Sequence, residues 1–259
     1  MAGNVFRSDP TNVGDWYCAP SRYFPLGNAN SLDVIDTDLA ALDGHVIVGG
    51  GGLVAKTFHL HLERLARYRS KLSSLVAWGI GESEHVDRTG GFVLPYAGNW
   101  PDYMAAFDLV GVRDYGTSLR WVPCASCMMP ELERPAPVTR DIVIYEHKRI
   151  PIPIDEGFAR RTNSGNDIAS VLAFLASAEL VITNSYHGAY WATLMGRRVL
   201  AIVNMSKMYR FKHSPVICRV EHWKRFASLA QVYPMALTEC RAASTAFYRD
   251  VAALRGQSE

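Results

Sequence analysis

The stretch 180–203 constrains the fold of this chain more than any other part of it. Its two ends, 180–183 and 199–203, are short apolar runs rich in β-branched residues, which are typical of buried strands. The segment between them, 186–195, fits one helix that ends at Gly196. We therefore predict a strand, a polar turn, a helix and a second strand. This unit is typical of a parallel sheet covered by helices.

The polar turn before this helix is a candidate binding site. It consists of Thr183, Asn184 and Ser185, and His187 follows in the first helical turn. Ligands of open α/β sheets bind at the carboxyl ends of strands, and a helix amino terminus favours anions. A single histidine beside a helix start is more often structural than catalytic, so the turn needs basic partners before it indicates a function.

Composition excludes several classes of protein. The chain has 259 residues, enough for two domains, and its net charge of +2 is too small to indicate nucleic acid as the main partner. No window has the 18 or more apolar residues that span a membrane, and the amino terminus does not resemble a signal peptide. Five cysteines, an odd number, do not form a disulfide framework. We predict a protein of the reducing cytoplasm.

Strands and helices alternate along most of the chain, although its first residues carry little strand signal. We predict strands at 45–48, 74–79, 107–112 and 141–145, and helices at 58–71 and 167–178. A charged, proline-rich segment at 131–138 is the predicted linker. The pattern predicts an α/β protein with an N-terminal domain at 1–132 and a C-terminal domain at 138–259. Its last helix is expected to pack back on the N-terminal domain.

Three basic residues, Arg113, His187 and Lys207, each follow a predicted strand. If the two sheets face each other, the loops at their strand ends converge. Arginine offers a fork for carboxylate or phosphate, lysine a compact charge, and histidine a group that transfers protons near neutral pH. The trio suits a small, doubly anionic substrate. In the alternative interpretation, Arg113 and Asp114 form a surface ion pair and Lys207 is a solvated loop residue.

Three further motifs have both a functional and a structural interpretation. Gly50 and Gly51 follow a strand and could expose amides to an anion, but they lack the lysine of a P-loop, and a tight crossing without ligand is the alternative. Asn12 and Asp15 fit either a site or a helix cap. Cys124-Ala-Ser-Cys127 has the spacing of a redox or half-zinc motif, but no second such pair exists, so we predict buried cysteines and no metal site.

Taken in order, these elements resemble the polysaccharide pyruvyl transferase family over residues 11–212. The matching segments are Asn12-Val-Gly-Asp15, the Gly49–Gly52 loop, Gly79-Ile-Gly81, Val112-Arg113-Asp114, the segment 181–188 ending in His187-Gly188, and Lys207. The resemblance implies two Rossmann-like domains that face each other across a cleft, as in GT-B glycosyltransferases. It also implies transfer of the pyruvyl group of phosphoenolpyruvate to sugar hydroxyls, commonly with closure of a cyclic ketal.

The resemblance places Arg113, His187 and Lys207 around phosphoenolpyruvate, with Asp15 as a further catalytic candidate. We expect no cofactor beyond phosphoenolpyruvate as donor substrate, and no metal. The acceptor is a saccharide of surface or exopolysaccharide biosynthesis, either free or lipid-linked; in the second case we expect peripheral association with the inner face of the membrane. The alternatives are a nucleotide-sugar-dependent GT-B glycosyltransferase and a non-catalytic saccharide-binding protein. The predicted substrate-binding residues are Asn12, Gly50, Gly51, Asn184, Ser185, Tyr186, Gly188 and Lys212.

Overall fold

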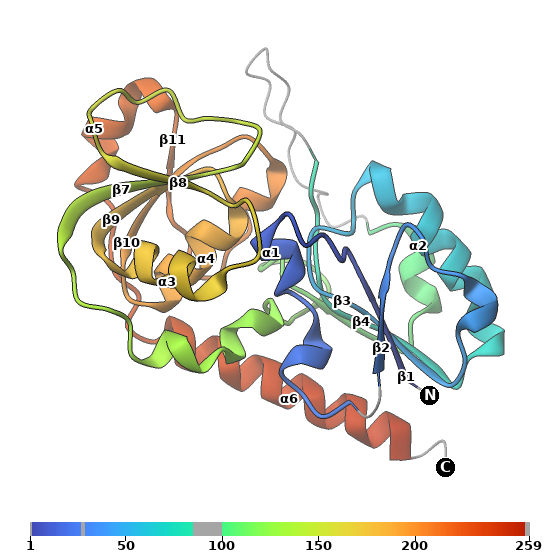
Figure 1. Ribbon diagram of the computed structural model, residues 1–259. Helices are drawn as coiled ribbons and strands as arrows, with labels where there is room; N and C mark the ends of the chain where they lie inside the picture. Colours follow the sequence, from blue (N-terminus) through green and yellow to red (C-terminus); the bar gives the residue numbers. More distant parts are fainter. Residues whose placement is uncertain (1, 27–28, 85–99, 257–259) are drawn as a thin grey trace.

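The first half of the chain forms a parallel sheet of six strands. A computed structural model describes residues 2–26, 29–84 and 100–256 (Figure 1). Within these residues the strand order is β2-β1-β3-β4-β5-β6, and every neighbouring pair is parallel. The strands are β1 (Ala2–Phe6), β2 (Ala29–Asp33), β3 (His45–Gly49), β4 (Ser74–Ile80), β5 (Leu109–Val112) and β6 (Arg120–Trp121).

The second half forms a parallel sheet of five strands in the order β11-β10-β9-β7-β8. Its strands are β7 (Arg140–Glu146), β8 (Ala159–Thr162), β9 (Ala178–Thr183), β10 (Arg198–Ile202) and β11 (Val216–Cys218). Two parallel sheets in a mixed α/β chain confirm the predicted fold class and are consistent with two Rossmann-like halves. The boundaries at 132 and 138 and the GT-B arrangement stay predictions.

Strand β1 is the clearest element that the sequence does not reveal. It lies inside the first sheet, between β2 and β3, yet among its residues only Val5 and Phe6 are strong strand formers. Pairing on both sides, together with burial of these two side chains, supplies the stabilisation that its local propensity lacks.

Helices cover the sheets because alternate strand residues point to opposite faces. In the second sheet Ile144 and Ile182 pack in one buried cluster, whereas Val143 and Val181 pack in the other. The helices are α1 (Val13–Trp16), α2 (Lys56–Tyr68), α3 (Ile168–Ala176), α4 (Tyr186–Leu194), α5 (Trp223–Ala227) and α6 (Ala236–Gly256). Short 3-10 helices are η1 (Pro20–Arg22), η2 (Leu39–Ala41), η3 (Arg69–Lys71), η4 (Asp102–Ala106), η5 (Ala125–Met128), η6 (Pro130–Glu133), η7 (Ser206–Met208) and η8 (Val220–His222).

Helix α4 is unusual because every one of its side chains is buried. The Ser185 side chain caps it by accepting a hydrogen bond from the backbone amide of Gly188. Gly188 itself lies against the ring of Tyr145, where an added Cβ would be 2.3 Å from the nearest ring carbon. The helix can therefore sit close to β7 only because position 188 has no side chain.

Helix α6 runs along both halves of the molecule (Figure 1, red). Near its start, Cys240 packs in a buried cluster with Tyr190 of α4. Near its end, Phe247 and Val251 pack in a cluster with Trp78 of the first sheet, and the Trp78 and Phe247 ring centroids are 5.2 Å apart. The helix thus buries apolar surface of both sheets. None of the described helices is long and apolar enough to cross a bilayer.

The loop between β1 and α1 also joins the halves. The Val13 amide donates to the Asn163 carbonyl (3.2 Å), and the Gly165 amide donates to the Thr11 carbonyl (3.1 Å). Lys148 donates to the Thr11 carbonyl (2.9 Å) and pairs with Asp9 (3.3 Å). These contacts fix the loop, which belongs to the first half, on the carboxyl ends of β7 and β8.

Replacing Phe247 by Ala should lower the free energy of unfolding by about 3–5 kcal/mol, because it leaves a cavity between α6 and Trp78. Phe226→Ala, on α5, is the matched control; its side chain is only partly buried, and the cost should be below about 2 kcal/mol. Urea unfolding of both variants measures the difference. Equal costs would contradict the packing of α6 on the first sheet.

Candidate active site

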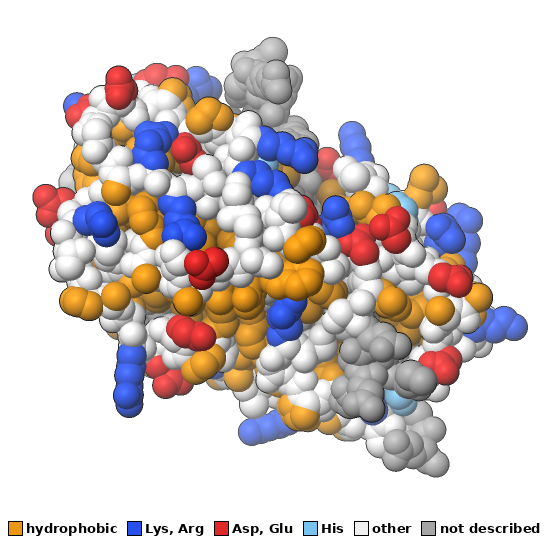
Figure 2. All heavy atoms as spheres, viewed as in Figure 1, with side chains coloured by type: hydrophobic (Ala, Val, Ile, Leu, Met, Phe, Trp, Pro, Cys, Tyr) orange, Lys and Arg blue, Asp and Glu red, His pale blue; other side chains and the backbone are white. Residues whose placement is uncertain are grey.

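A large pocket of about 400 Å³ lies where the carboxyl ends of the two sheets meet. Residues that follow β1, β3 and β4 form one side of it, and residues that follow β7, β8, β9 and β10 form the other. In the view of Figure 2, Lys and Arg side chains gather above α1, between the two halves. The lining residues are Arg7, Asn12, Asp15, Gly52, Leu53, Phe58, Ser83, His147, Arg149, Ile150, Asn163, Ser185, Tyr186, His187, Met205 and Lys207.

His187 lines this pocket from the first turn of α4. Its ring packs on Trp191, with centroids 5.0 Å apart, and meets the edge of Tyr186. Gly14 of the opposite half lies against it so closely that an added Cβ would be 2.2 Å from Nδ1. Burial, and then the positive charges of Arg113 and Lys207, lower the pKa of His187 well below its ordinary value. The imidazole is therefore neutral at pH 7.

Arg113, at the end of β5, carries a buried guanidinium with unused hydrogen-bond donors. The residue is 3% exposed, and among the described residues neither Nε nor Nη2 has a hydrogen-bond partner. Its Cζ lies 3.8 Å from the centre of the Tyr186 ring, and the other face of that ring stacks on Phe211. A cation–π contact thus holds the cation without using its N–H groups. The alternative of a surface ion pair with Asp114 is wrong, because both residues are buried.

The neighbouring residue Asp114 has a structural role. Its carboxylate accepts a hydrogen bond from the backbone amide of Glu82 (2.9 Å), which joins the ends of β4 and β5. Burial raises the pKa of Asp114 to about 6, although the nearby Arg113 opposes the shift.

The Arg113 guanidinium lines a small pocket beside the large one, and glycines lie against it on the side of the large pocket. A Cβ added at Gly52, which lines the pocket, would be 3.1 Å from Nη2 of Arg113, and one at Gly81 would be 2.7 Å from Nε. Gly50 and Gly51, the glycines predicted to bind substrate, do not line the large pocket. They form the turn with positive φ angles, and a Cβ at Gly50 would be 2.1 Å from the Cys18 carbonyl oxygen. Within the run Gly49–Gly52, it is therefore Gly52 that contributes to the large pocket.

Lys207 and Asp15 bring opposite charges to the pocket from opposite halves. Burial, and then Arg113, lower the pKa of Lys207 to about 8, whereas Asp15 raises it slightly. Burial raises the pKa of Asp15, and Lys207 opposes that shift. Asn12 donates to the Asp15 carboxylate (2.6 Å) and also accepts from the Asn163 side chain (3.1 Å). Asn12 thus orients Asp15 on the far wall of the pocket.

Two of the predicted substrate-binding residues, Asn184 and Gly188, support the backbone around the pocket instead. The Asn184 side chain accepts from the His147 amide (2.7 Å) and donates to the Ile150 carbonyl (2.8 Å), so it braces the turn after β7. Gly188 allows α4 to approach Tyr145. Asn184 and Gly188 therefore shape the wall of the large pocket without lining it, whereas Ser185 and Tyr186 line it directly.

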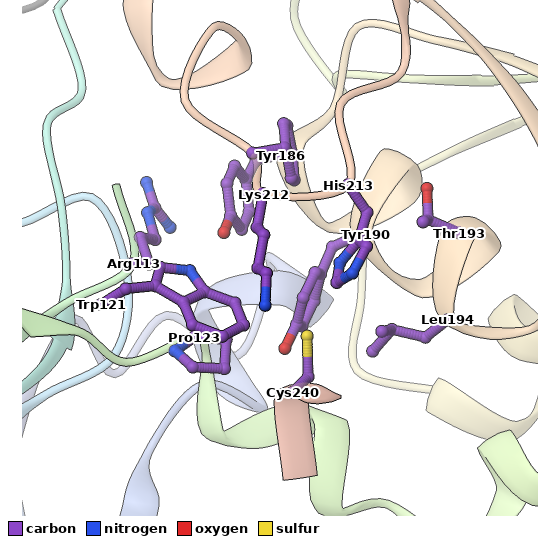
Figure 3. Close-up of a pocket in the computed structure, with 11 residues that line it drawn as sticks. Arg113, Trp121, Pro123, Tyr186, Tyr190, Thr193, Leu194, Lys212, His213 and Cys240 are labelled. Carbon is purple, nitrogen blue, oxygen red and sulfur yellow. The ribbon is translucent and has the colours of Figure 1, made fainter. Parts of the chain in front are cut away.

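Lys212 belongs to a different, small pocket, which it lines together with Arg113 and Tyr186 (Figure 3). Its Nζ pairs with Glu239 (2.8 Å) and lies 4.7 Å from the centre of the Trp121 ring. Tyr186 lines both pockets, whereas Arg113 lines the small pocket and is not among the residues that line the large one. The structure does not bring Lys212 into the large pocket.

Three basic residues of the pocket were not predicted. Arg7 follows β1 and is ion-paired with Asp33, and His147 and Arg149 lie in the turn after β7. The signal for the last two was present, because a run of basic residues follows the strand predicted at 141–145. All five cysteines are free and buried, and no group of three metal-ligating side chains occurs among residues 2–26, 29–84 and 100–256.

Comparisons with known proteins give a family match and a similar solved structure. A family model described as "Polysaccharide pyruvyl transferase" matches residues 5–206. Among solved structures, the chain is similar to a functionally uncharacterised protein, KP1_0663, from Klebsiella pneumoniae subsp. pneumoniae NTUH-K2044. That similarity has a TM-score of 0.46 and 14% identity over 78% of this chain and 84% of the other. A search of curated proteins finds no match.

The pKa of Lys207 predicts how a small dianion binds. Sulfate keeps its charge from pH 7 to 9, but Lys207 loses its charge as the pH rises through about 8. Sulfate affinity should therefore fall by about tenfold over this range, the loss of one charge-assisted hydrogen bond. Isothermal titration calorimetry measures it. Lys207→Arg should remove the pH dependence and keep the affinity, whereas Lys207→Met should bind weakly at every pH. An unchanged pH dependence in Lys207→Met would exclude this assignment.

Proposed function

The chain belongs to the polysaccharide pyruvyl transferase family, and we propose that it moves the pyruvyl group of phosphoenolpyruvate onto hydroxyls of a saccharide. The observation that carries the proposal is the buried guanidinium of Arg113, whose Nε and Nη2 have no partner among the described residues. A buried charged donor without a partner costs free energy, and an anionic ligand removes that cost. Phosphoenolpyruvate offers such a ligand, because it carries a carboxylate and a phosphate.

The proposed donor site lies between Arg113 and Lys207. The guanidinium fork binds a carboxylate or a phosphate through two parallel hydrogen bonds. Lys207 lines the large pocket from the other half, close enough for the charge of Arg113 to lower its pKa, and in the proposed site its ammonium group stabilises the charge that develops on the departing phosphate. Ser185, at the amino end of α4, places a hydroxyl and a helix terminus near the anion.

The reaction requires proton movement but no net proton uptake. One sugar hydroxyl forms a bond to C2 of phosphoenolpyruvate while C3 gains a proton and becomes a methyl group. Phosphate then leaves with its bridging oxygen, and a second hydroxyl bonds to C2 and closes the ketal. Of the two hydroxyl protons, one balances the proton gained by C3 and the other leaves with phosphate. His187 and Asp15 are titratable groups that line the large pocket from opposite halves of the molecule.

The remainder of the large pocket suits a saccharide. A volume of about 400 Å³ exceeds what a molecule as small as phosphoenolpyruvate needs. Apolar side chains, including Phe58 and Ile150, line it beside polar ones such as Asn163 and Ser83, which matches the mixed faces of a sugar ring. We propose a free or lipid-linked acceptor of surface polysaccharide biosynthesis in the cytoplasm, with a GT-B-like cleft around both substrates.

An assay with competing donors tests the function. The purified protein is incubated with phosphoenolpyruvate or with nucleotide-sugars, plus a mixture of glycans, and both phosphate and glycan products are measured. We expect phosphate release in step with pyruvate ketal on the glycan. His187→Ala should lower the rate by about 10²–10⁴-fold and Arg113→Met by about 10²–10³-fold.

His222→Ala and Arg197→Met are matched controls, because both positions lie outside the large pocket, and they should keep the wild-type rate. Sugar transfer from a nucleotide-sugar would contradict the proposal in favour of a glycosyltransferase. Glycan binding without turnover of either donor, unaffected by His187→Ala, would contradict it in favour of a saccharide-binding protein.

A further inference from the structure

A chain of buried hydrogen bonds ends on the ring of His187, on the side away from Gly14. The indole Nε1 of Trp191 lies 3.0 Å from Oγ of Ser126, and that hydroxyl lies 3.2 Å from Sγ of Cys124. Sγ of Cys124 in turn lies 3.5 Å from Nε2 of His187. Ser126 and Cys124 are 0% exposed, so water does not replace any of these bonds.

The direction of the chain follows from its first member. An indole N–H only donates, so Ser126 must accept from Trp191. The hydroxyl proton of Ser126 is then free to be donated to Cys124, its other partner. The thiol proton of Cys124 is in turn donated to Nε2 of His187. This arrangement gives every proton in the chain an acceptor. If Nε2 of His187 donated to Cys124 instead, either the thiol proton or the hydroxyl proton of Ser126 would be buried without an acceptor among these groups.

We propose that Cys124 is a positioning residue that fixes the neutral His187 ring in the tautomer with its proton on Nδ1. Among the described residues the only hydrogen bond of the His187 ring is the one at Nε2, so no side chain or backbone group of these residues accepts from Nδ1. Nδ1 is the ring atom nearest the Cβ position of Gly14, in the loop that carries Asp15. The Nδ1 proton is therefore directed toward the half of the pocket from which the acceptor hydroxyl is activated.

The protonation states agree with this arrangement. Burial lowers the pKa of His187 and raises the pKa of the Cys124 thiol. The pair is therefore a neutral thiol beside a neutral imidazole, and not the thiolate–imidazolium pair of a cysteine nucleophile. The hydrogen-bond chain to His187 also explains the Cys124-Ala-Ser-Cys127 motif. Cys124 and Ser126 serve the histidine, whereas Cys127 points to Ser244 of α6 at 3.6 Å.

The tautomer divides the proton chemistry between two residues. With Nδ1 protonated, His187 donates a hydrogen bond to a substrate oxygen, and it does not accept the hydroxyl proton at that atom. Asp15, whose pKa is raised by burial, is then the group that takes the proton from the acceptor hydroxyl. This consequence rests on the proposed function; the assignment of the tautomer does not.

Nitrogen NMR of the ligand-free protein tests the tautomer. With histidine labelled by ¹⁵N, the protonated ring nitrogen resonates well upfield of the other, and His187→Gln identifies which of the 8 histidines is observed. We expect the wild type and Cys124→Ser to show the proton on Nδ1, because a hydroxyl also donates. Cys124→Ala and Ser126→Ala should shift the ring toward Nε2–H. Cys127→Ala, in the same 3-10 helix, is the matched control and should leave the signal unchanged.

A wild-type ring protonated on Nε2, or an unchanged signal in both Cys124→Ala and Ser126→Ala, would overturn the proposal. Turnover is a second measurement. Cys124→Ala should lower kcat by about tenfold or more with little change in KM, and Cys124→Ser should restore it. If the NMR signals move as expected but the wild type does not turn over phosphoenolpyruvate, the tautomer assignment stands and the proposed function fails.

Discussion

The pocket depends on the close approach of Gly14 to the imidazole of His187. The two residues come from different halves of the molecule, and even a methyl group at position 14 would be 2.2 Å from Nδ1. Hydrogen bonds from Val13 and to Thr11 hold the loop in this place. The same contact puts Asp15 opposite Lys207 across the pocket. The catalytic candidates are thus assembled by backbone docking between the halves, and no side chain can be added at that point without separating them.

Burial then decides the charges of the assembled groups. Desolvation raises the pKa of Asp15 and lowers the pKa values of His187 and Lys207, so each group is moved toward its neutral form. The guanidinium of Arg113 is buried as well, where it lies against the Tyr186 ring and interacts with the charge of Asp114. Each unit of pKa shift corresponds to about 1.36 kcal/mol of differential interaction. An anion with two charged ends offsets the free-energy cost of burying positive charge at Arg113 and at Lys207 at the same time. This is a physical basis for selecting a small dianion.

The sequence predicts the fold well where local pattern and tertiary structure agree. Runs of β-branched residues followed by polar turns identify the strands that end at Thr183, Ile80 and Val112, and with them the positions of Arg113 and His187. Strand β1 is missed because pairing on both sides, and not its composition, stabilises it. The packing of Phe247 on Trp78 joins residues far apart in the chain, and no local pattern identifies such a partner.

The chemistry of the site is less predictable than its location. The sequence indicates which residues are basic, but not that Arg113 is held by an aromatic ring or that Lys212 is paired with Glu239 behind it. It also cannot distinguish Gly52 from Gly50, because the difference depends on what an added Cβ would meet. The same limit applies to Cys124, whose spacing indicates a metal or redox motif and whose contacts in the fold are those of a hydrogen-bond donor.

The central claim is that Arg113, His187 and Lys207 surround phosphoenolpyruvate, and a crystal structure with that ligand bound tests it most directly. The account predicts the ligand in the large pocket. Nε and Nη2 of Arg113, Nζ of Lys207 and Nδ1 of His187 should each lie about 2.7–3.2 Å from its oxygens. Phosphoenolpyruvate bound elsewhere, with the Arg113 guanidinium still lacking a partner, would contradict the account.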